Sequence, residues 1–541
     1  MPDDQDNQTV SLSRANAVAV PVDPAGVSAA RWAKLIDRKD NSKVTPFIDG
    51  GEAFVEMGKV LLLPNGPKDF IYLAGWDFAP STLMGQATMG DLLKIADQRG
   101  VMIRALFWMN SKPGQRPNGF ASGPPPNNAP MVQFIENLKN GAAIHDNRHL
   151  NFGSHHQKIL AVKHGDRVTA FCGGLDIHPL RSTAGWHDVH CMVEGPGAEA
   201  LAAVFLERWS DHPWKQFANA ATFIVPPKQR SVGEHYTKVL RTYGEGSFLG
   251  GLRVPAGTAR IGGTLELGTI RAPERYAFAP NGATKILDFL VKAIENTERF
   301  IYIEDQYLVQ STKMRALKGV SIAHHLANKV AESGFKKLVI LLARTDHIQG
   351  EMHQAWRRRR AFINPIKKAA PDKVIVCHYA ARAGSRFIHS KTWIFDDEVA
   401  LIGSANCNRR GYSHDSEVAI AVSDENPPLS TAGEGAATPG DAPGKRLFLA
   451  HSLRISLWQK HLKPVVGQPP TVRDLLDPVA SATRFWAKPA ADAPIEPYDV
   501  DGDKTAGPTM QDRRITEPLF GRTLAGDFDS DWDILLDPDG P

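Results

Sequence analysis

The stretch FIHSKTWIFDDEVALIGSANCNRRG, from Phe387 to Gly411, places a histidine and a lysine two positions apart between apolar flanks. The flanks are typical of a buried β-strand, where residues two apart project to the same face, so we expect His389 and Lys391 to point together. A buried ammonium group without a partner costs several kcal/mol. Such a strand therefore predicts a neighbouring anion, although a single pair of this kind is more often an accident of a strand edge.

A second copy of the pattern changes that balance. The stretch SHHQKILAVKHGDRVTAFCGGLD, from Ser154 to Asp176, holds His156 and Lys158 at the same spacing. Two such strands in matched settings predict one phosphate site. The lysines would supply charge to the phosphate oxygens, and the imidazoles would serve attack and proton transfer.

An aspartate follows one of the lysines at a fixed distance. Asp396 is the fifth residue after Lys391, whereas the fifth residue after Lys158 is Lys163. Asp166 and Asp396 each lie seven residues before a glycine, so an extension of the first hairpin by three residues would make them counterparts. We therefore predict that Asp166 matches Asp396.

Small and polar residues follow each hairpin, and two acids lie further downstream. Glycines allow a close approach of backbone to ligand, and serine or asparagine can hydrogen-bond phosphate oxygens. The residues predicted to bind phosphate are Gly173, Gly174, Gly403, Ser404 and Asn406. The two acids are Asp188 and Glu417, and a carboxylate on the far nitrogen of each histidine would fix its tautomer and stabilise its charged form. Glu417 alone would read as a surface acid, but its strand-like setting favours this role.

The surrounding chain predicts an α/β fold with an internal duplication. The strand-like FIYLAGWDFAP (70–80) precedes a helix-like segment and the strand VMIRALFW. In the second half the helical TKILDFLVKAIENTE precedes the strand RFIYIEDQYLV, then a second helix and the strand KLVILLA. This alternation predicts two similar lobes, each a mixed β-sheet flanked by helices, related by a pseudo-two-fold axis with the active site between them. Glu304, in the strand RFIYIEDQYLV, is a candidate to brace the site.

Length and composition set the domain plan. A chain of 541 residues is too long for one simple core. The predicted divisions are an N-terminal extension (1–44), an N-terminal lobe (45–245), a linker (246–270), a C-terminal lobe (271–480) with a Pro/Gly/Ala-rich loop (424–445), and an acidic tail (481–541). The four cysteines lie far apart without a CxxC pair, which argues against a zinc site or a disulfide framework, and we predict no metal or cofactor.

These residues resemble the phospholipase D superfamily. HSKTWIFD…GSAN is similar to its His-x-Lys-x4-Asp signature with the following Gly-Ser-x-Asn, and IYIEDQYLV, HHQKILAV…GGLD…WHDVH and VLRTY extend the resemblance over roughly residues 45–465. The absence of C2, PX and PH modules suggests a bacterial-type enzyme. The resemblance implies a metal-independent mechanism with a phosphohistidine intermediate. It implies the catalytic set His156, Lys158, Asp166, His389, Lys391 and Asp396, with His156 as nucleophile and His389 as acid and base, although the near symmetry of the sequence leaves that order open.

The resemblance predicts a phospholipase D that releases phosphatidic acid and headgroup alcohol, with headgroup exchange as a further activity. The alternatives are a nuclease-type phosphodiesterase, which the mild net charge of +4 disfavours, and a headgroup transferase. No apolar run approaches the ~20 residues of a membrane-spanning helix and no Sec-type signal is visible, so we expect peripheral contact with phospholipid and no nucleic acid partner. We also hypothesise cytoplasmic synthesis followed by signal-independent export as a toxin-like effector, with a secretion-machinery or immunity-protein partner.

Overall fold

The structure of the protein is a computed structural model. It describes residues 31–37, 39, 41–108, 128–146, 154–182, 185–212, 222–244, 260–261, 265–266, 276–309, 320–348, 355–384, 386–424, 448–464 and 466–500. Most of the predicted linker and nearly all of the predicted Pro/Gly/Ala-rich loop fall outside these ranges, as does the chain beyond residue 500.

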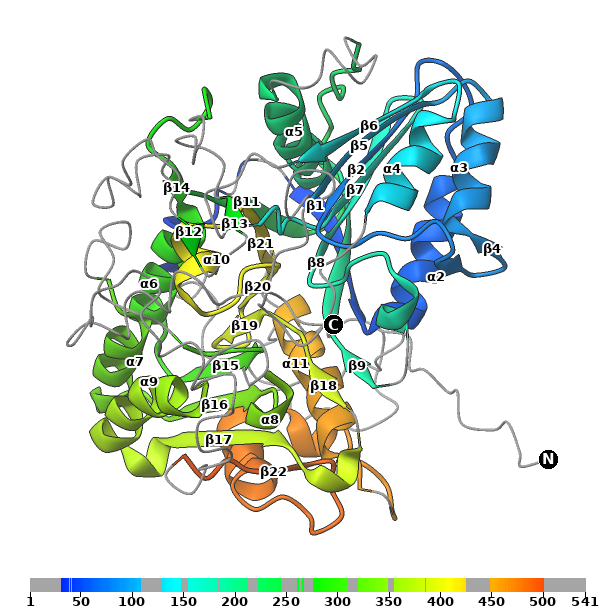
Figure 1. Cartoon of the computed structure of the whole chain (residues 1–541). Helices are drawn as coiled ribbons and strands as arrows, with labels where there is room; N and C mark the ends of the chain where they lie inside the picture. The colour runs from blue at the N-terminus through cyan, green and yellow to red at the C-terminus, as the bar shows by residue number, and fades with distance from the viewer. Residues whose placement is uncertain are drawn as a thin grey trace.

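The N-terminal half forms a mixed β-sheet flanked by helices (Figure 1). Its strands are β1 (Asn41–Ile48), β2 (Phe70–Gly75), β3 (Leu83–Met84), β4 (Ala87–Thr88), β5 (Met102–Trp108), β6 (Gly141–Asp146), β7 (Ile159–His164), β8 (Arg167–Gly173), β9 (Trp186–His187) and β10 (Val189–Glu194). Its helices are α2 (Gly50–Leu61), α3 (Met89–Gln98), α4 (Ala129–Glu136) and α5 (Pro196–Asp211), with the short turn η2 (Pro179–Ser182). The apolar run of β2 is wholly buried, as a central strand between β5 and β7 requires.

The C-terminal half repeats this plan. Its strands are β11 (His235–Tyr243), β12 (Arg260–Ile261), β13 (Leu265–Glu266), β14 (Ala283–Thr284), β15 (Phe300–Asp305), β16 (Lys337–Leu342), β17 (Val374–Tyr379), β18 (Phe387–Ile388), β19 (Thr392–Phe395), β20 (Val399–Gly403), β21 (Glu417–Asp424) and β22 (Ile495–Pro497). Its helices are α6 (Lys285–Asn296), α7 (Ile322–Ala331), α8 (Thr345–Ile348), α9 (Ala355–Ala369), α10 (Arg409–Ser413), α11 (Leu449–Leu462) and α12 (Pro478–Ser481), with short turns η5 (Pro371–Lys373), η6 (Ala381–Ala383), η7 (Arg473–Leu475) and η8 (Ala482–Trp486). The predicted α/β fold class is confirmed.

The strand order is the same in both halves when each is followed from its outer side. It is β6-β5-β2-β7-β8-β10-β1 in the N-terminal half and β17-β16-β15-β19-β20-β21-β11 in the C-terminal half, with β22 beyond β17. An internal duplication would produce this order. The two sheets are not separate, however, because β1 pairs with β11 through Asn41↔Tyr236 and Ser42↔His235. The predicted lobes therefore share one continuous sheet among the described residues.

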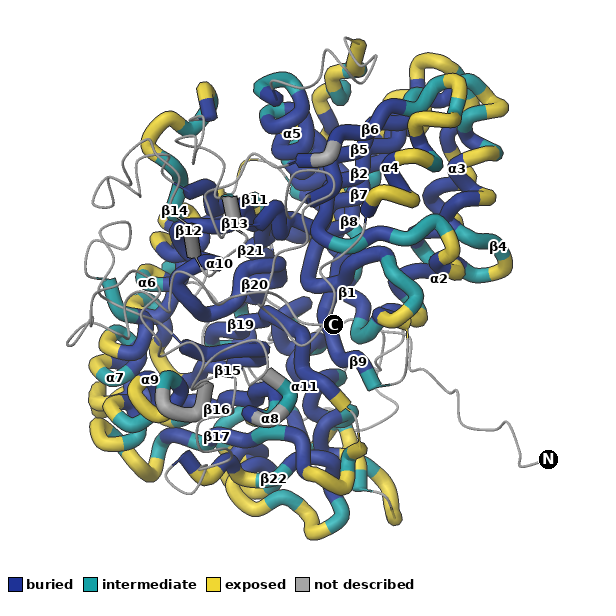
Figure 2. Tube along the Cα trace, viewed as in Figure 1, coloured by how far each residue is buried: buried dark blue, intermediate teal, exposed yellow. Residues whose placement is uncertain are grey.

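Alternate side chains of the C-terminal strands enter two different cores. Ile301 and Ile303 of β15 pack in a core with α6, α7 and α9. Phe300 and Tyr302 face the other way, into a core that contains Trp458 of α11 and also the apolar residues of the N-terminal half. Figure 1 shows α11 on the side of the C-terminal sheet opposite to α6, α7 and α9, and Figure 2 shows the buried strands running through the centre of both halves.

Two predicted boundaries fall inside the folded part. In the N-terminal extension, Trp32 is 1% exposed and its ring nitrogen donates to Glu398 (2.6 Å). In the predicted acidic tail, β22 pairs with β17, and Trp486 is fully buried. The extension and the start of the tail thus both pack on the C-terminal half, and composition alone could not reveal this.

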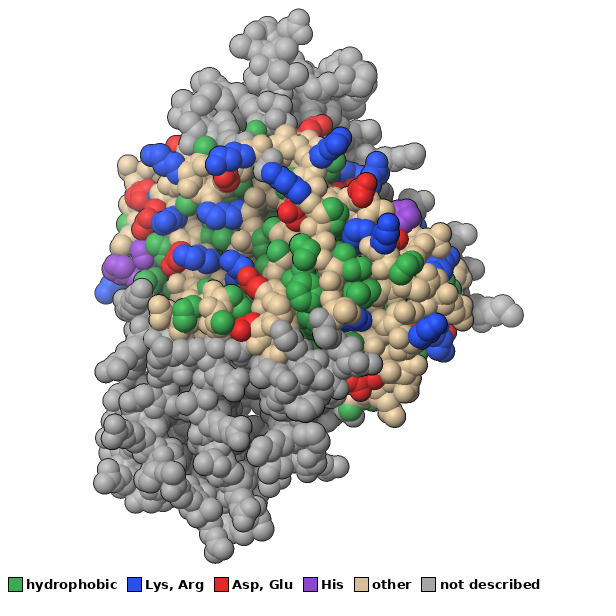
Figure 3. Space-filling model, turned by 90° about the horizontal axis from the view of Figure 1, so that it is seen from above, with side chains coloured by type: hydrophobic (Ala, Val, Ile, Leu, Met, Phe, Trp, Pro, Cys, Tyr) green, Lys and Arg blue, Asp and Glu red, His purple; other side chains and the backbone are tan. Residues whose placement is uncertain are grey.

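The surface is mixed in character. Figure 3 shows basic and acidic side chains interspersed on the described part of one face, around a central apolar area. Within the described ranges, no helix combines the length and apolarity needed to cross a membrane.

Candidate active site

Each His-Lys segment pairs with backbone of the opposite half. The amide of His156 donates to the carbonyl of Ser416 (3.0 Å), and that of His389 donates to the carbonyl of His187 (2.8 Å). The segment that precedes His389, β18, also pairs in parallel with β9. The expected strand geometry is therefore only partly correct, since 156–158 and 389–391 lie just before β7 and β19 rather than within them. The two crossings bring both histidines to the junction of the halves.

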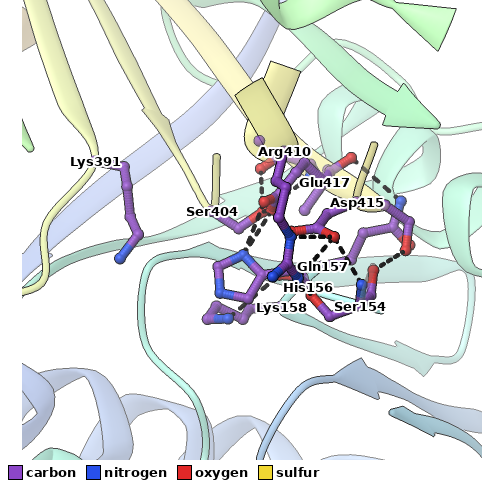
Figure 4. Close-up of polar contacts among 12 residues, drawn as sticks. Ser154, His156, Gln157, Lys158, Lys391, Ser404, Arg410, Asp415 and Glu417 are labelled. Carbon is purple, nitrogen blue, oxygen red and sulfur yellow. Dashed lines mark hydrogen bonds and ion pairs between the residues drawn. The ribbon is translucent and has the colours of Figure 1, made fainter. Parts of the chain in front are cut away.

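The carboxylate partner of each histidine also comes from the opposite half. Nδ1 of His156 lies 2.8 Å and 2.9 Å from the two oxygens of Glu417 (Figure 4). Nδ1 of His389 lies 2.6 Å from Oδ2 of Asp188. All four side chains are at most 3% exposed. In both pairs the carboxylate leaves Nε2 as the ring nitrogen directed to other chemistry.

Burial controls the protonation of the second pair. Burial, reinforced by Lys391 and other nearby cations, lowers the pKa of His389 well below its ordinary value. Burial also raises the pKa of Asp188 to about 6, although Lys391 and His187 oppose the rise. Near neutral pH the pair is therefore a neutral imidazole that donates from Nδ1 to a carboxylate. Nε2 of His389 is buried and makes no hydrogen bond to the described residues.

The two lysines lie beside the histidines, and their polar partners differ. Nζ of Lys158 is 3.4 Å from Oδ2 of Asp176, whereas Nζ of Lys391 donates to the amide oxygen of Gln306 (3.0 Å). Both lysines depress the pKa of His389, so charges from both halves act on one place. Figure 4 shows Lys391 reaching toward this region on a different segment from His156 and Lys158.

Asp396 lies away from these groups, and its contacts lead us to expect a structural role in place of the predicted catalytic one. Its carboxylate accepts hydrogen bonds from the backbone amides of Glu298 (2.7 Å), Arg299 (2.9 Å) and Phe300 (2.8 Å). It also pairs with Arg31 of the N-terminal extension (3.1 Å). Asp396 therefore fixes the start of β15 at the far end of the β19 strand.

The prediction that Asp166 matches Asp396 is wrong by strand register. Lys163 stands opposite Phe70 of β2, just as Asp396 stands opposite Phe300 of β15, to whose carbonyl it donates its amide and from whose amide its carboxylate accepts. Lys163 donates to the carbonyl of Lys68 (2.7 Å) and pairs with Asp69 (3.3 Å), so the acid has moved to the partner strand. Asp166 lies in the exposed hairpin turn.

The residues predicted to bind phosphate are buried and packed closely against their neighbours. A Cβ atom on Gly174 would lie 1.9 Å from Oδ1 of Asp188, and one on Gly403 would lie 2.4 Å from Cβ of Ala419. Gly173 has a φ of +152°, and a Cβ atom on it would lie 2.6 Å from Cα of His190. The hydroxyl of Ser404 donates to Glu417. Asn406 is buried near the site, in the loop after β20.

Several site residues carried no clear sequence signal. Asp176 and Gln306 hold the lysines, and no spacing rule connects them to their partners. Trp186 lies against His389, with ring centroids 4.8 Å apart, and Trp76 approaches His156 edge-on at 6.3 Å. Apolar walls of this kind strengthen the electrostatic interactions inside the site.

The chain is similar to known proteins in its sequence. Residues 290–432 match the family model described as cardiolipin synthase, PLD-like domain. Phospholipase D alpha 2 of Arabidopsis thaliana is 24% identical over 73% of this chain, and phospholipase D alpha 1 of Nicotiana tabacum is 23% identical over 73%. These matches support the phospholipase D superfamily. The chain spans 62% of the length of each of these two relatives.

Solved structures also resemble the chain, at low similarity. A phosphatidylserine synthase from Haemophilus influenzae has a TM-score of 0.46 and 11% identity, over 73% of this chain and 87% of its own. Yeast tyrosyl-DNA phosphodiesterase has a TM-score of 0.37 and 9% identity, over 71% of this chain and 89% of its own.

Proposed function

We propose that the protein is a phospholipase D that hydrolyses the distal phosphodiester of glycerophospholipids to phosphatidic acid and the headgroup alcohol. The comparisons support a phosphodiesterase of the superfamily, and the names of the curated relatives favour phospholipid as substrate. The observation that carries the proposal is the crossed arrangement, in which each imidazole binds a carboxylate of the other half and a lysine lies beside it.

The proposed reaction has two steps. Nε2 of one histidine bonds to phosphorus as the bond from phosphorus to the headgroup oxygen breaks, and the other histidine gives its proton to that oxygen. The second histidine, now neutral, then takes a proton from water, whose oxygen bonds to phosphorus as the phosphorus–nitrogen bond breaks. The superfamily resemblance assigns His156 to attack and His389 to proton transfer. An acceptor alcohol in place of water would give headgroup exchange.

The charged groups suit these steps. Lys158 and Lys391 would stabilise the negative charge on the equatorial oxygens in the transition state. An anionic phosphodiester beside His389 would favour the protonated imidazole that the first step needs, against the depression of its pKa by burial.

The decisive experiment compares lipid and nucleic acid substrates. The full chain is incubated with phosphatidylcholine vesicles, phosphatidylethanolamine vesicles or plasmid DNA, with EDTA present throughout. We expect phosphatidic acid to be released despite the chelator, and the release to be lost in His156→Ala and His389→Ala. Cleavage of DNA without turnover of lipid would replace the proposal with the nuclease alternative.

A further inference from the structure

A second buried polar cluster lies at the junction of the halves, beside the Asp188–His389 pair. Its centre is Glu304 of β15, which is 0% exposed. The carboxylate lies 2.8 Å from Nε2 of His187 and 2.9 Å from Nε2 of His461, and it accepts a hydrogen bond from the hydroxyl of Tyr302 (2.7 Å). His187 belongs to the N-terminal half and the other three residues to the C-terminal half, so the cluster ties the halves together.

Each histidine of this cluster has a further partner on its other ring nitrogen. Nδ1 of His461 lies 3.0 Å from the hydroxyl of Tyr379. Nδ1 of His187 lies 2.9 Å from Oδ1 of Asp49 and 2.7 Å from Nζ of Lys460, which also pairs with Asp49. The cluster thus runs from the start of α2, through β9 and β15, to α11 and β17.

The donor atoms of His187, Glu304 and His461 lie within 4.8 Å of one another, a spacing that would also suit a divalent metal ion. The charge balance of the cluster favours a bound proton over a bound metal ion. Glu304, Asp49 and Lys460 sum to one negative charge, which a single imidazolium neutralises, whereas a divalent ion would leave a buried positive charge. The two imidazoles also bond different oxygens of Glu304, as hydrogen-bond donors would.

The pKa shifts of the two histidines agree with a cluster that holds one imidazolium. Burial and Lys460 act to lower the pKa of His187, but Glu304 and Asp49 outweigh them, so the pKa is raised. Burial lowers the pKa of His461 to about 4. Of the two, His187 is therefore the better site for the neutralising proton, and His461 is a neutral imidazole between Tyr379 and Glu304.

The cluster reaches the active site through the backbone on both sides of Asp188. Asp49 donates its amide to the carbonyl of Asp188 (2.8 Å), and its carboxylate accepts the amide of Asp188 (3.2 Å). Asp49 adopts a φ of +68°, a strained conformation for a residue with a side chain. His187 precedes Asp188 directly and binds the amide of His389 through its own carbonyl.

We propose that Glu304 and His187 form a positioning clamp that fixes Asp188 against His389. The clamp deepens the proposed function, because it sets the orientation of the histidine assigned to proton transfer. Gln306, which follows directly after β15 and lies two residues beyond Glu304, binds Lys391. The end of β15 thus positions both the acidic partner of His389 and the neighbouring lysine.

The first test needs no substrate. The full chain is labelled with 15N-histidine, and the Nδ1 proton of His389 is assigned by its loss in His389→Gln. His187 and His461 bond different oxygens of Glu304, and Glu304→Gln replaces one of these oxygens by an NH2 group, so we expect the His389 resonance to move upfield or broaden away. Tyr302→Phe is the matched control, because it removes a donor to the same carboxylate and leaves both histidines in place; we expect no change in the resonance.

Asp49→Asn provides a second variant if Glu304→Gln does not fold, because the Asp49 side chain is 32% exposed and tolerates an isosteric change better. It should shift the same resonance. An unchanged resonance in every folded clamp variant would overturn the proposal. So would one equivalent of tightly bound zinc, iron or manganese that purifies with the native chain and is lost in Glu304→Gln, because the cluster would then be a metal site.

The second test measures turnover of phosphatidylcholine. We expect kcat to fall about 10- to 100-fold in Glu304→Gln with KM within about twofold, because a small misplacement of a catalytic group slows the chemical step. Tyr302→Phe should leave both constants within about twofold. A rise in KM alone would contradict a positioning role. If the native chain turns over no phospholipid, the resonance still decides the clamp, and the proposed function fails separately.

Discussion

The two histidine–carboxylate pairs make the same contact but hold their acids by different means. Glu417 begins the regular strand β21, where it stands opposite Thr242 of β11, and the hydroxyl of Ser404 donates to it. Asp188 lies in the break between β9 and β10, and Asp49 rather than a strand partner holds its backbone on both sides, through its amide and its carboxylate. Sheet register is thus sufficient to place one acid, whereas a network drawn from both halves places the other.

The difference extends to the second oxygen of each acid. Both oxygens of Glu417 lie within hydrogen-bond distance of His156, and one of them also accepts from the Ser404 hydroxyl, a group that can donate or accept. Asp188 gives one oxygen to His389 and the other to the backbone amide of Val189, which can only donate (2.9 Å). The surroundings of Glu417 can therefore accommodate a change of the carboxylate to an amide, and those of Asp188 cannot.

The largest expected effect comes from the histidines themselves. Replacing His156 or His389 by asparagine should lower kcat for phosphatidylcholine by at least about 10³-fold, because each residue carries a bond-making or proton-transfer step. A phosphatidyl ester of p-nitrophenol distinguishes their roles, since its leaving group needs no proton. His389→Asn should retain a burst of p-nitrophenol and His156→Asn should show none; the reverse pattern would exchange the two roles.

Amide variants of the two carboxylates should differ in activity, because each carboxylate has a different partner besides its histidine. Asp188→Asn cannot serve both His389 and Val189 with oxygen, so its amide nitrogen imposes the wrong tautomer on His389 or leaves Val189 unpaired. We expect kcat to fall by about 10²- to 10⁴-fold, the range of general acid–base catalysis. Glu417→Gln can turn its oxygen to His156 and its nitrogen to Ser404, so the loss should be about 10-fold. Equal losses would show that the surroundings of the two acids do not matter.

The pH profile should report the same asymmetry. The pKa of Asp188 is raised to about 6, so this acid takes up a proton as the pH falls through that value and no longer stabilises a charged His389. We expect kcat to decline about tenfold per pH unit below about 6. Because the folded state binds this proton more readily than the unfolded state, this group adds stability as the pH falls through the same range.

The loss of activity near pH 5 should therefore occur in a folded protein, which circular dichroism at the same pH can check. A fall in the folded signal that parallels the fall in kcat would assign the acidic limb to unfolding instead. The fall of kcat at acidic pH should persist in Glu417→Gln and should be absent in Asp188→Asn.

Local patterns predicted the residues of this site better than its connections. The spacing of His156, Lys158, His389 and Lys391 is a short-range feature, and the structure brings the region of each pair to one junction. The exchange of Asp188 and Glu417 between the halves was not predictable, because spacing along a chain does not say which half a strand end faces. The Glu304 cluster joins residues separated by up to 411 positions, for which no local signal exists.

The two hairpins give the smallest expected effect and show where a local pattern misleads. In one hairpin the Asp396 carboxylate accepts hydrogen bonds from three backbone amides at the start of β15. In the other hairpin the corresponding residue is the cation Lys163, and the acid, Asp69, lies at the start of the neighbouring strand. Asp396→Asn loses some of these acceptors and its ion pair, so it should lower the free energy of unfolding by about 1–3 kcal/mol. Asp166→Asn, in the exposed turn, should stay within about 0.5 kcal/mol of the parent chain.

Urea unfolding measures both changes, and kcat per folded molecule should stay within about twofold in each variant. That second measurement separates a structural aspartate from a catalytic one. A catalytic role for Asp396 would require a loss of kcat in a chain that remains folded, and its side chain contacts the start of β15 rather than the junction where the histidines lie. The aspartate five residues after the lysine thus makes a contact between neighbouring strands. A lysine can stand in its place where the opposite strand supplies the acid, as Asp69 does for Lys163.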